Sequence, residues 1–269
     1  MIPSWLTVRR ADTPLILAMP HGGIELPDGL ADAFRSPWLA QRDADWHIQA
    51  IYAGLVDATV IATSVSRSII DVNRDPSGAS LYPGQATTDL CPTTTFDGEP
   101  LYRNEASVPD DAGIADRRAT WFDPYHAALA GEIARLRALH ATVVVYDCHS
   151  IRSRIPRLFD GELPVFNIGT NGGATCNPAL REGVIRACAA SDQSYVGDGR
   201  FRGGWTTRNY GRPDDGVHAI QMELAIRGYL TEPETPSSHN WPPPFDAAVA
   251  APMRVTLSTI LTACLEFAR

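Results

Sequence analysis

TVVVYDCHS, residues 142–150, carries the strongest structural signal in this chain. Its run Val143–Val145 is β-branched throughout, which is typical of a strand buried on both faces of an α/β sheet. The run leads directly into Asp147, Cys148 and His149. Burying such polar groups costs free energy unless they are paired or bind a ligand. The segment therefore predicts a central strand that leads into a functional site.

Helical and strand patterns alternate on both sides of this segment. Before it, residues 121–140 repeat apolar side chains every three to four positions, as an amphipathic helix does. The other expected elements are strands at 15–18, 59–62, 69–72, 164–168 and 217–224, and helices at 45–56 and 245–268. This alternation predicts an α/β fold of three αβα layers around a mostly parallel or mixed sheet. We expect a single domain over residues 1–269.

Composition excludes several classes of function. The chain has 269 residues, is 44% hydrophobic and carries a net charge of −8. All 23 basic residues are arginine. Without lysine the chain cannot form a Schiff base, anchor pyridoxal phosphate or supply a P-loop amine. The acidic balance also argues against a nucleic-acid groove, but it leaves room for a small anionic ligand held by a few arginines.

Membrane and secretory signals are not expected from the sequence. It holds no run of 18 apolar residues, and its first five residues do not resemble a leader peptide. Its five cysteines are scattered without CxxC spacing, which favours neither a disulfide framework nor a zinc ribbon. We predict a cytoplasmic protein without membrane partners, either a monomer or a small homo-oligomer.

Histidines follow two of the predicted strands. In open α/β sheets, ligands bind just past the carboxyl ends of the strands. His21 follows strand 15–18 and precedes two glycines, which would let a ligand approach the backbone closely. Alone, His21 is equally consistent with an ordinary turn residue. His149 is the stronger candidate, because Asp147 lies two residues before it on the same side of an extended chain and could orient its ring.

A carboxylate lies inside an otherwise apolar strand at 217–224. Period-two alternation places Gln221 and Glu223 on one face and His218 on the other. Buried carboxylates are rare without a partner or a chemical task. Glu223 is therefore a candidate general base, whereas His218 is expected to be structural.

Three arginines are candidates for binding a carboxylate. A lone arginine usually forms a surface ion pair, but Arg67, Arg74 and Arg208 adjoin Ser, Asn, Thr and Gly residues. Thr206, two residues before Arg208, is a further candidate for binding the substrate. Guanidinium groups bind carboxylates through two parallel hydrogen bonds, as a small anionic substrate would require. The chain has no Gly-x-Ser-x-Gly elbow, which a serine hydrolase would need. It also has no GxGxxG motif after a strand, which a dinucleotide-binding fold would need.

An ordered set of motifs resembles the N-formylglutamate amidohydrolase (deformylase) family from about residue 14 to residue 230. The motifs are PHGG at 20–23, RDADWH at 42–47, SR at 66–67, DVNR at 71–74, LCPTTTFDG at 90–98, DCHS at 147–150, GWTTRNYG at 204–211 and QMEL at 221–224. The resemblance implies a fold similar to that of zinc carboxypeptidases and aspartoacylases, with a mixed sheet and one catalytic divalent metal, Zn²⁺.

Carried over residue by residue, the resemblance implies that His21 and His149 are metal ligands and that Glu223 is the catalytic carboxylate. Asn73, with Arg74, resembles the Asn-Arg pair that holds a substrate carboxylate in that fold. The carboxylate ligand of zinc carboxypeptidases follows the first histidine by three residues, where this chain has Ile24. Two acidic candidates remain for the third ligand, Asp45 first and Glu25 second.

The implied activity is metal-dependent hydrolysis of N-formyl-L-glutamate to formate and L-glutamate, as in histidine catabolism. One alternative is a related metal-dependent amidohydrolase that acts on another N-acyl amino acid or small peptide. Another is a non-catalytic amino-acid or metal sensor. A sensor does not need a buried general base such as Glu223, so the enzyme is favoured.

Overall fold

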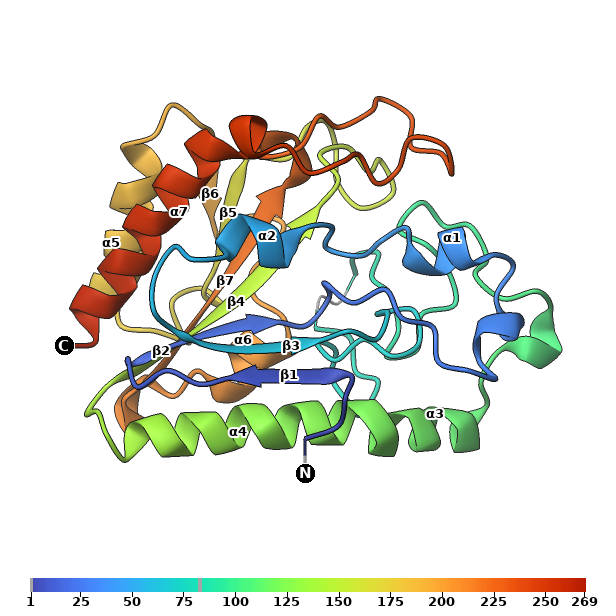
Figure 1. Ribbon diagram of the computed structural model, residues 1–269, viewed down its shortest axis with the longest axis horizontal. Coiled ribbons are helices and arrows are strands. Elements are labelled where there is room, and N and C mark those ends of the chain that lie inside the picture. The colour runs from blue at the N-terminus through green and yellow to red at the C-terminus, as the bar shows by residue number, and fades with distance from the viewer. Residues whose placement is uncertain (1, 82–83) are drawn as a thin grey trace.

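Seven strands form one mixed sheet in residues 2–81 and 84–269, the part of the chain that this computed structural model describes. The sheet order is β1-β3-β2-β4-β7-β5-β6 (Figure 1). β3, β2, β4 and β7 run parallel to one another. β1 pairs antiparallel with β3, β5 pairs antiparallel with β7, and β6 pairs parallel with β5. The strands are β1 Leu6–Arg9, β2 Leu15–Met19, β3 Thr59–Thr63, β4 Val143–Ile151, β5 Phe166–Gly169, β6 Tyr195–Gly197 and β7 Val217–Ala225. The predicted mixed sheet is confirmed.

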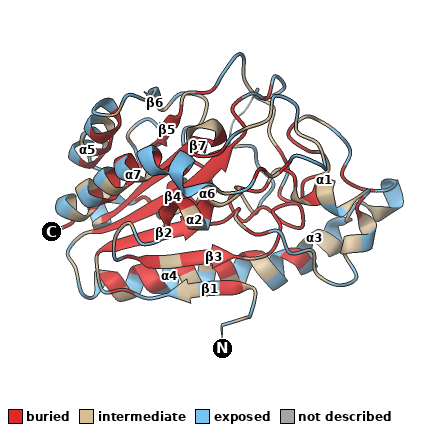
Figure 2. Ribbon diagram, turned by 45° about the horizontal axis from the view of Figure 1, so that its top comes forward, coloured by how far each residue is buried: buried red, intermediate tan, exposed pale blue. Residues whose placement is uncertain are grey.

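Helices cover both faces of the sheet. α2 (Ile48–Tyr52), α5 (Pro178–Ala189) and α7 (Ala247–Phe267) pack on one face, and α4 (Asp123–Arg137) and α6 (Trp205–Tyr210) on the other (Figures 1 and 2). Successive side chains of β4 point to opposite faces of the sheet. Val144, Tyr146 and Cys148 pack on the α7 side, and Val143 and Val145 pack on the α4 side. The predicted three-layer order is confirmed. Outside these layers lie α1 (Pro37–Gln41) and α3 (Asp111–Arg117).

The predicted long helix is present, with an extension before it. α4 begins at Asp123-Pro124, where proline suits the first turn, and it buries Tyr125, Leu129, Ile133 and Leu136 as one stripe. A π-helical turn at Arg118–Phe122 joins it to α3, so the helical segment begins ten residues earlier than its apolar pattern indicates. Short 3₁₀ turns occur at Ala31–Ala33, Glu105–Ser107, Pro213–Asp215 and Ile226–Gly228.

Three expected elements differ from the structure. The predicted strand at 69–72 is wrong: the chain turns there, because the Ser66 hydroxyl accepts the Ser68 N–H and Asp71 Oδ1 accepts the Asn73 N–H. Such local side-chain bonds compete with a strand ladder. The helix expected at 45–56 is reduced to α2, and β4 continues to Ile151, so that Asp147 and His149 lie within the strand rather than after it.

α7 is, among the described helices, the one long and apolar enough to cross a membrane by length and composition. Its apolar stripe, which includes Met253, Leu257, Ile260 and Leu261, is buried against the sheet and α5.

The sheet topology places a crevice at the carboxyl ends of β2 and β4. These strands are neighbours, but the chain leaves β2 toward β3 on one side and leaves β4 toward β5 on the other. Such a switch point is where α/β sheets bind ligands.

Candidate active site

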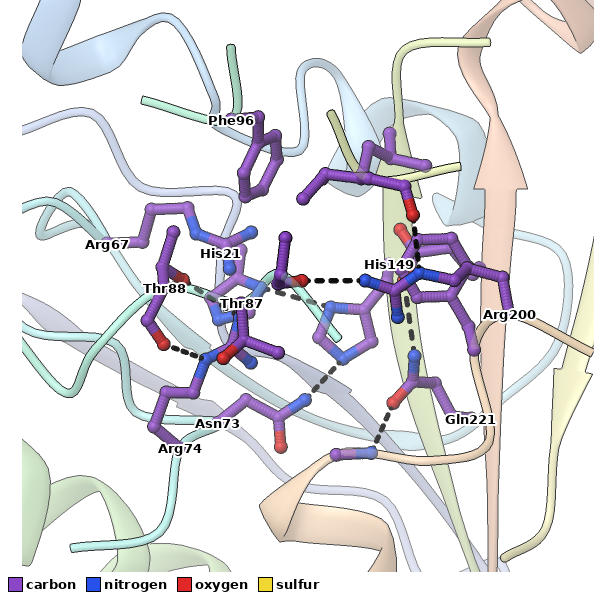
Figure 3. A pocket seen from close by; sticks show the side chains of 16 residues that line it. His21, Arg67, Asn73, Arg74, Thr87, Thr88, Phe96, His149, Arg200 and Gln221 are labelled. Carbon is purple, nitrogen blue, oxygen red and sulfur yellow. Dashed lines mark hydrogen bonds between the residues drawn. The ribbon is translucent and has the colours of Figure 1, made fainter. Parts of the chain in front are cut away.

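A pocket lies at this crevice and is lined by the loops that follow β2, β3, β4 and β6, by the end of β4 and by β7 (Figure 3). Its polar lining carries histidine, arginine and carboxylate groups, and its apolar lining includes two phenylalanines. The lining residues are His21, Arg67, Asn73, Arg74, Ala86, Thr87, Thr88, Phe96, His149, Ile151, Leu158, Arg200, Phe201, Gly204, Gln221 and Glu223.

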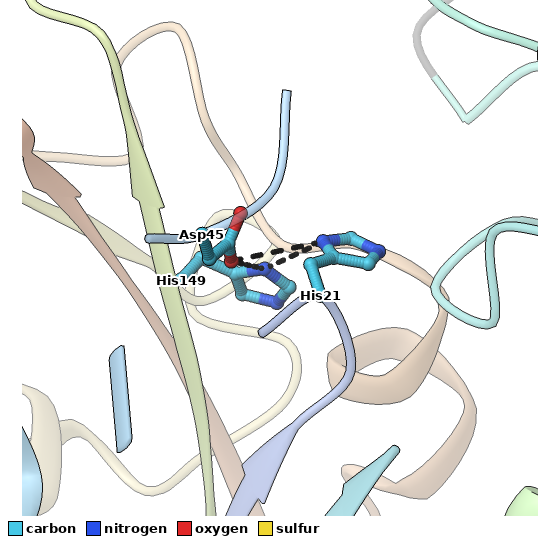
Figure 4. A group of neighbouring side chains, drawn as sticks. All are labelled: His21, Asp45 and His149. Carbon is cyan, nitrogen blue, oxygen red and sulfur yellow. Dashed lines mark hydrogen bonds and ion pairs between the residues drawn. The ribbon is translucent and has the colours of Figure 1, made fainter. Parts of the chain in front are cut away.

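Three buried donor atoms converge at the base of the pocket (Figure 4). His21 Nδ1 lies 3.1 Å from His149 Nδ1, His149 Nδ1 lies 3.2 Å from Asp45 Oδ2, and His21 Nδ1 lies 3.8 Å from the same oxygen. His21 follows β2, His149 lies in β4, and Asp45 precedes α2. The Asp45 N–H donates to the His21 carbonyl, which ties the two loops together.

The donor set fits a tetrahedral zinc ion. Bonds of about 2.0–2.1 Å to zinc require neighbouring ligand atoms to lie about 3.3 Å apart, close to the three separations observed. Two imidazoles and one carboxylate also leave a fourth position open, as in catalytic zinc sites. Neither Asp45 oxygen accepts a hydrogen bond from the described residues. Its charge faces His149 Nδ1 at 3.2 Å and Arg67 Nη1 at 3.6 Å, and a bound cation would stabilise this buried carboxylate further.

Glu25 lies outside this cluster. Its side chain is exposed, and its Oε2 accepts a 2.6 Å hydrogen bond from the Ser64 hydroxyl. Of the two acidic candidates, only Asp45 lies with His21 and His149.

In each histidine of the cluster, Nε2, the ring nitrogen that faces away from Asp45, lies within hydrogen-bond distance of a carboxylate. His21 Nε2 lies 2.7 Å from Asp71 Oδ1, and His149 Nε2 lies 3.0 Å from Asp147 Oδ2. When each Nε2 donates its proton to its carboxylate, both Nδ1 atoms can act as metal ligands beside Asp45, which is the arrangement that metal-binding histidines adopt. The predicted orientation of His149 by Asp147 is confirmed, whereas Asp71 is an additional partner for His21.

The histidines differ in charge when no metal is bound. Burial, aided by Arg67, lowers the pKa of His21 to about 4. Burial also disfavours charge on His149, but Asp147 and Asp45 raise its pKa well above the ordinary value. Metal binding would therefore release a proton from His149.

Asn73 is a structural link between the loop after β3, β4 and α6. Its Nδ2 donates to Asp147 Oδ2 at 3.2 Å and lies 2.9 Å from His149 Nε2, while its Oδ1 accepts the Thr206 N–H at 2.7 Å. The close approach needs glycine at 204, because a Cβ there would lie 2.4 Å from Asn73 Nδ2. Thr206 is fully buried by these contacts and does not line the pocket.

The predicted arginines divide into two groups. Arg67 and Arg74 line the pocket, and both approach the buried Asp71 carboxylate, at 2.6 and 3.7 Å. Although burial opposes it, these arginines and His21 hold the pKa of Asp71 well below its ordinary value. Arg208 does not line the pocket, and its Nε donates to the Gly203 carbonyl.

Phe96 covers Arg67, whose guanidinium lies 4.9 Å from the ring centroid. The Phe96 N–H donates to Asp43 Oδ2 at 2.6 Å, so the loop bearing the ring is fixed to the segment that supplies Asp45. Arg152 lies between Asp43 and Asp97 and reinforces this attachment.

Glu223 enters the pocket beside His149, because the two residues are register partners in β7 and β4. Burial raises the pKa of Glu223 to about 8. Its Oε2 accepts a hydrogen bond from Gln221 Nε2 at 3.2 Å, and Gln221 Oε1 in turn accepts the Gly204 N–H. The glutamine amide is thus fixed in the orientation that points its donor at Glu223.

Sequence reasoning missed Arg200, Gln221 and Asp71. Asp71 belongs to the DVNR motif, and Gln221 shares a strand face with Glu223, so the sequence contained a signal that could have identified each of them as a site residue. Arg200 follows Gly199 in a glycine-rich segment, the criterion that selected Arg208. Local composition alone cannot tell which of these arginines faces a pocket.

Comparisons with known proteins agree over the whole chain. Residues 13–230 match the N-formylglutamate amidohydrolase family. The chain is 40% identical over 267 residues to the N-formylglutamate deformylase of Pseudomonas aeruginosa, covering 98% of this chain and 97% of that protein. It is also 40% identical over 265 residues to the N-formylglutamate deformylase of Pseudomonas putida, covering 97% and 96%.

Two solved structures share the fold. The N-formylglutamate amidohydrolase of Ralstonia eutropha JMP134 superposes with a TM-score of 0.79 at 22% identity, covering 100% of this chain and 99% of that chain. A gene product of Agrobacterium tumefaciens superposes with a TM-score of 0.71 at 15% identity, covering 98% and 96%.

Proposed function

The chain belongs to the N-formylglutamate amidohydrolase family, and from this premise we propose that it hydrolyses N-formyl-L-glutamate to formate and L-glutamate in histidine degradation. The observation that carries the proposal is the convergence of His21, Asp45 and His149 beside the buried Glu223 in one pocket. Relatives that are 40% identical over nearly their full length bear the name of this activity.

His21, Asp45 and His149 would hold the catalytic metal, which we propose to be zinc. When bound, zinc supplies Lewis acidity and lowers the pKa of water toward about 7. Asp71 and Asp147 keep both imidazoles in the tautomer that presents Nδ1.

Glu223 serves as the general base and then as the general acid. It takes the proton of the attacking water as the new C–O bond forms at the formyl carbon. It then delivers that proton to the nitrogen as the C–N bond breaks, so glutamate leaves with its amine. A carboxyl whose pKa is raised toward neutrality suits both transfers, and Gln221 holds it in one orientation.

Arg67 and Arg74 bring positive charge to the same side of the pocket. Arg67 Nη1 lies 3.6 Å from Asp45 Oδ1, so its charge is beside the reacting carbonyl and stabilises the oxygen as negative charge develops there. Arg74 is oriented by Thr88, whose carbonyl and hydroxyl accept its Nε and Nη2 at 3.0 and 2.9 Å. We assign it to the substrate α-carboxylate.

Formate release from N-formyl-L-glutamate by metal-loaded protein tests the proposal. Chelated protein and N-acetyl-L-glutamate serve as parallel controls. We expect chelator-sensitive release from the formyl compound and little action on the acetyl compound, which is larger by one methyl group. No release by folded, metal-loaded protein would contradict the assignment. Release from a different N-acyl amino acid alone would instead identify a related amidohydrolase.

A further inference from the structure

The segment between β6 and α6 is fixed at its start by hydrogen bonds to the loop after β5. The Asp198 carboxylate accepts the Thr170 and Gly172 N–H groups at 2.7 and 3.1 Å. The Arg202 carbonyl accepts the Asn171 N–H at 2.6 Å. Hydrogen bonds therefore fix the backbone on both sides of Arg200, at Asp198 and at Arg202.

Close backbone contacts fix the other end of this segment. Gly203 has φ +107°, a conformation that favours glycine, and a Cβ on Gly169 would lie 2.5 Å from the Gly203 nitrogen. The Gly204 N–H donates to Gln221 Oε1 at 2.7 Å, which joins the segment to the strand that carries Glu223. Arg200 is thus presented to the pocket by backbone anchored on both sides.

The Arg200 side chain is itself oriented before any ligand binds. Its Nε donates to the Leu158 carbonyl and its Nη2 to the Ala86 carbonyl, both at 2.8 Å, and its guanidinium lies 5.3 Å from the Phe201 ring centroid. The two carbonyls set the plane of the guanidinium. A group ordered in advance loses little further conformational entropy when it binds a ligand.

Arg200 lies on a different wall of the pocket from the other arginines. In Figure 3, Arg67 and Arg74 lie on one side of the histidines and Arg200 on the other. Arg67 and Arg74 approach Asp71 and so belong to the ionic network around the metal ligands. Apolar groups from Ile151 and Leu158 also line the pocket.

We propose that Arg200 is a specificity-determining residue that binds the side-chain carboxylate of the substrate and so selects N-formyl amino acids with acidic side chains. This inference rests on the proposed function. A substrate with two carboxylates joined by methylene groups needs cationic groups on two walls and apolar contacts between them. Arg74 binds the α-carboxylate, which every N-formyl amino acid has. Arg200 binds the side-chain carboxylate, which distinguishes glutamate from glutamine.

The test compares kcat/KM for N-formyl-L-glutamate and N-formyl-L-glutamine in wild-type and Arg200→Gln proteins. We expect the wild type to prefer the glutamate compound by about 100-fold, because a charge-assisted pair is lost with the neutral amide. Arg200→Gln should lower the glutamate value by about 100-fold and leave the glutamine value nearly unchanged. Equal losses on both substrates, or no loss, would overturn the proposal.

Two further arginine variants separate recognition from general damage. Arg74→Gln should lower both values alike, because both substrates carry the α-carboxylate. Arg186→Gln, in an exposed ion pair with Glu182 on α5, should leave both values and their ratio unchanged. Arg200→Lys keeps the charge but loses the planar donor set, so it should retain part of the preference even if Arg200→Gln folds poorly.

A binding measurement separates this proposal from the proposed reaction. If wild-type protein releases formate from neither substrate, the proposed function fails while Arg200 is still tested by calorimetric titration with L-glutamate and L-glutamine. Tighter binding of glutamate that disappears in Arg200→Gln would support the role of Arg200. Equal affinity of the wild type for both amino acids would overturn it.

Discussion

Glu223 and Asp71 are both buried near His21 and His149, yet their pKa values move in opposite directions. Burial raises the pKa of Glu223 to about 8. Asp71 experiences the same desolvation, but Arg67, Arg74 and His21 approach it closely and hold its pKa well below the ordinary value. Glu223 accepts its hydrogen bond from the neutral amide of Gln221. The residue that can exchange protons near neutral pH is therefore Glu223, while Asp71 remains a fixed anion.

Glu223→Gln should lower kcat by about 10²–10⁴, the usual contribution of a general base, and leave the bound metal unchanged. The amide keeps the size of the side chain but cannot accept the proton. Steady-state formate release and elemental analysis of the purified protein measure the two effects. Glu25→Gln, at an exposed acidic position outside the cluster, is the matched control and should behave as wild type. A wild-type rate in Glu223→Gln would remove Glu223 from the mechanism.

At the scale of single elements, strand periodicity was the most informative sequence signal. It predicted that Asp147 and His149 share a face of β4 and that Cys148 takes the opposite face, where it packs with Tyr146. The choice between Asp45 and Glu25 could not be made this way, because both lie in loops. Their positions depend on tertiary contacts such as the Asp45 N–H bond to the His21 carbonyl.

α4 supports the site through His126. Its Nε2 donates to the Val72 carbonyl at 2.8 Å, its Nδ1 lies 3.0 Å from the Tyr210 hydroxyl of α6, and that hydroxyl donates to the His126 carbonyl at 3.1 Å. Val72 lies between Asp71, which contacts His21, and Asn73, which contacts His149. The helix, the loop after β3 and α6 are thus joined beneath the two metal-facing histidines. Burial lowers the pKa of His126 to about 4, so the imidazole is neutral at pH 7.

The half-buried His126 should make the free energy of unfolding depend on pH. Above pH 6.5 the imidazole is neutral in both states. Between pH 6.5 and about 4 the unfolded chain gains a proton that the folded protein does not, so stability falls as the pH falls. The loss is about 2 kcal/mol at pH 5 and approaches about 3 kcal/mol at pH 4. Urea unfolding of chelated protein at pH 7 and pH 5 measures it.

His126→Gln should flatten this part of the pH dependence, because glutamine does not titrate and can still donate to Val72. His140→Gln is the control, because His140 is a less buried histidine that bonds to the Asp12 carbonyl. It should keep the wild-type slope. An unchanged slope in His126→Gln would show that other groups cause the acid sensitivity.

At the scale of the whole molecule, the candidate metal donors join parts of the chain that are far apart. His21 and His149 are 128 residues apart in the sequence, and Asp45 comes from a third segment. Alternating strands and helices predicted the three layers, and the rule for strand ends predicted the edge where the histidines meet. Arg200 could not be found in this way, because its place depends on how the segment between β6 and α6 crosses the pocket. That crossing is set by contacts such as Gly169 with Gly203, which no local pattern reports.

Because three segments share the donors, metal binding should stabilise the entire fold. A ligand that binds only the folded state at about 1,000 times its Kd adds about 4 kcal/mol. For a chain of this size that corresponds to a rise in Tm of about 10 °C. We therefore expect chelation to lower Tm by about this amount and zinc to restore it, as measured by differential scanning calorimetry.

Two matched variants assign the third ligand from the same thermal measurement. Asp45→Asn removes the buried anion from the cluster, so zinc should raise its Tm by only a small fraction of the wild-type shift. Glu25→Gln should keep the full shift, because Glu25 is exposed and bonded to Ser64. The reverse pattern would transfer the ligand role from Asp45 to Glu25. A metal-insensitive Tm in the wild type would argue against a metal that bridges β2 and β4. This readout requires no turnover, so it tests the metal site separately from the reaction.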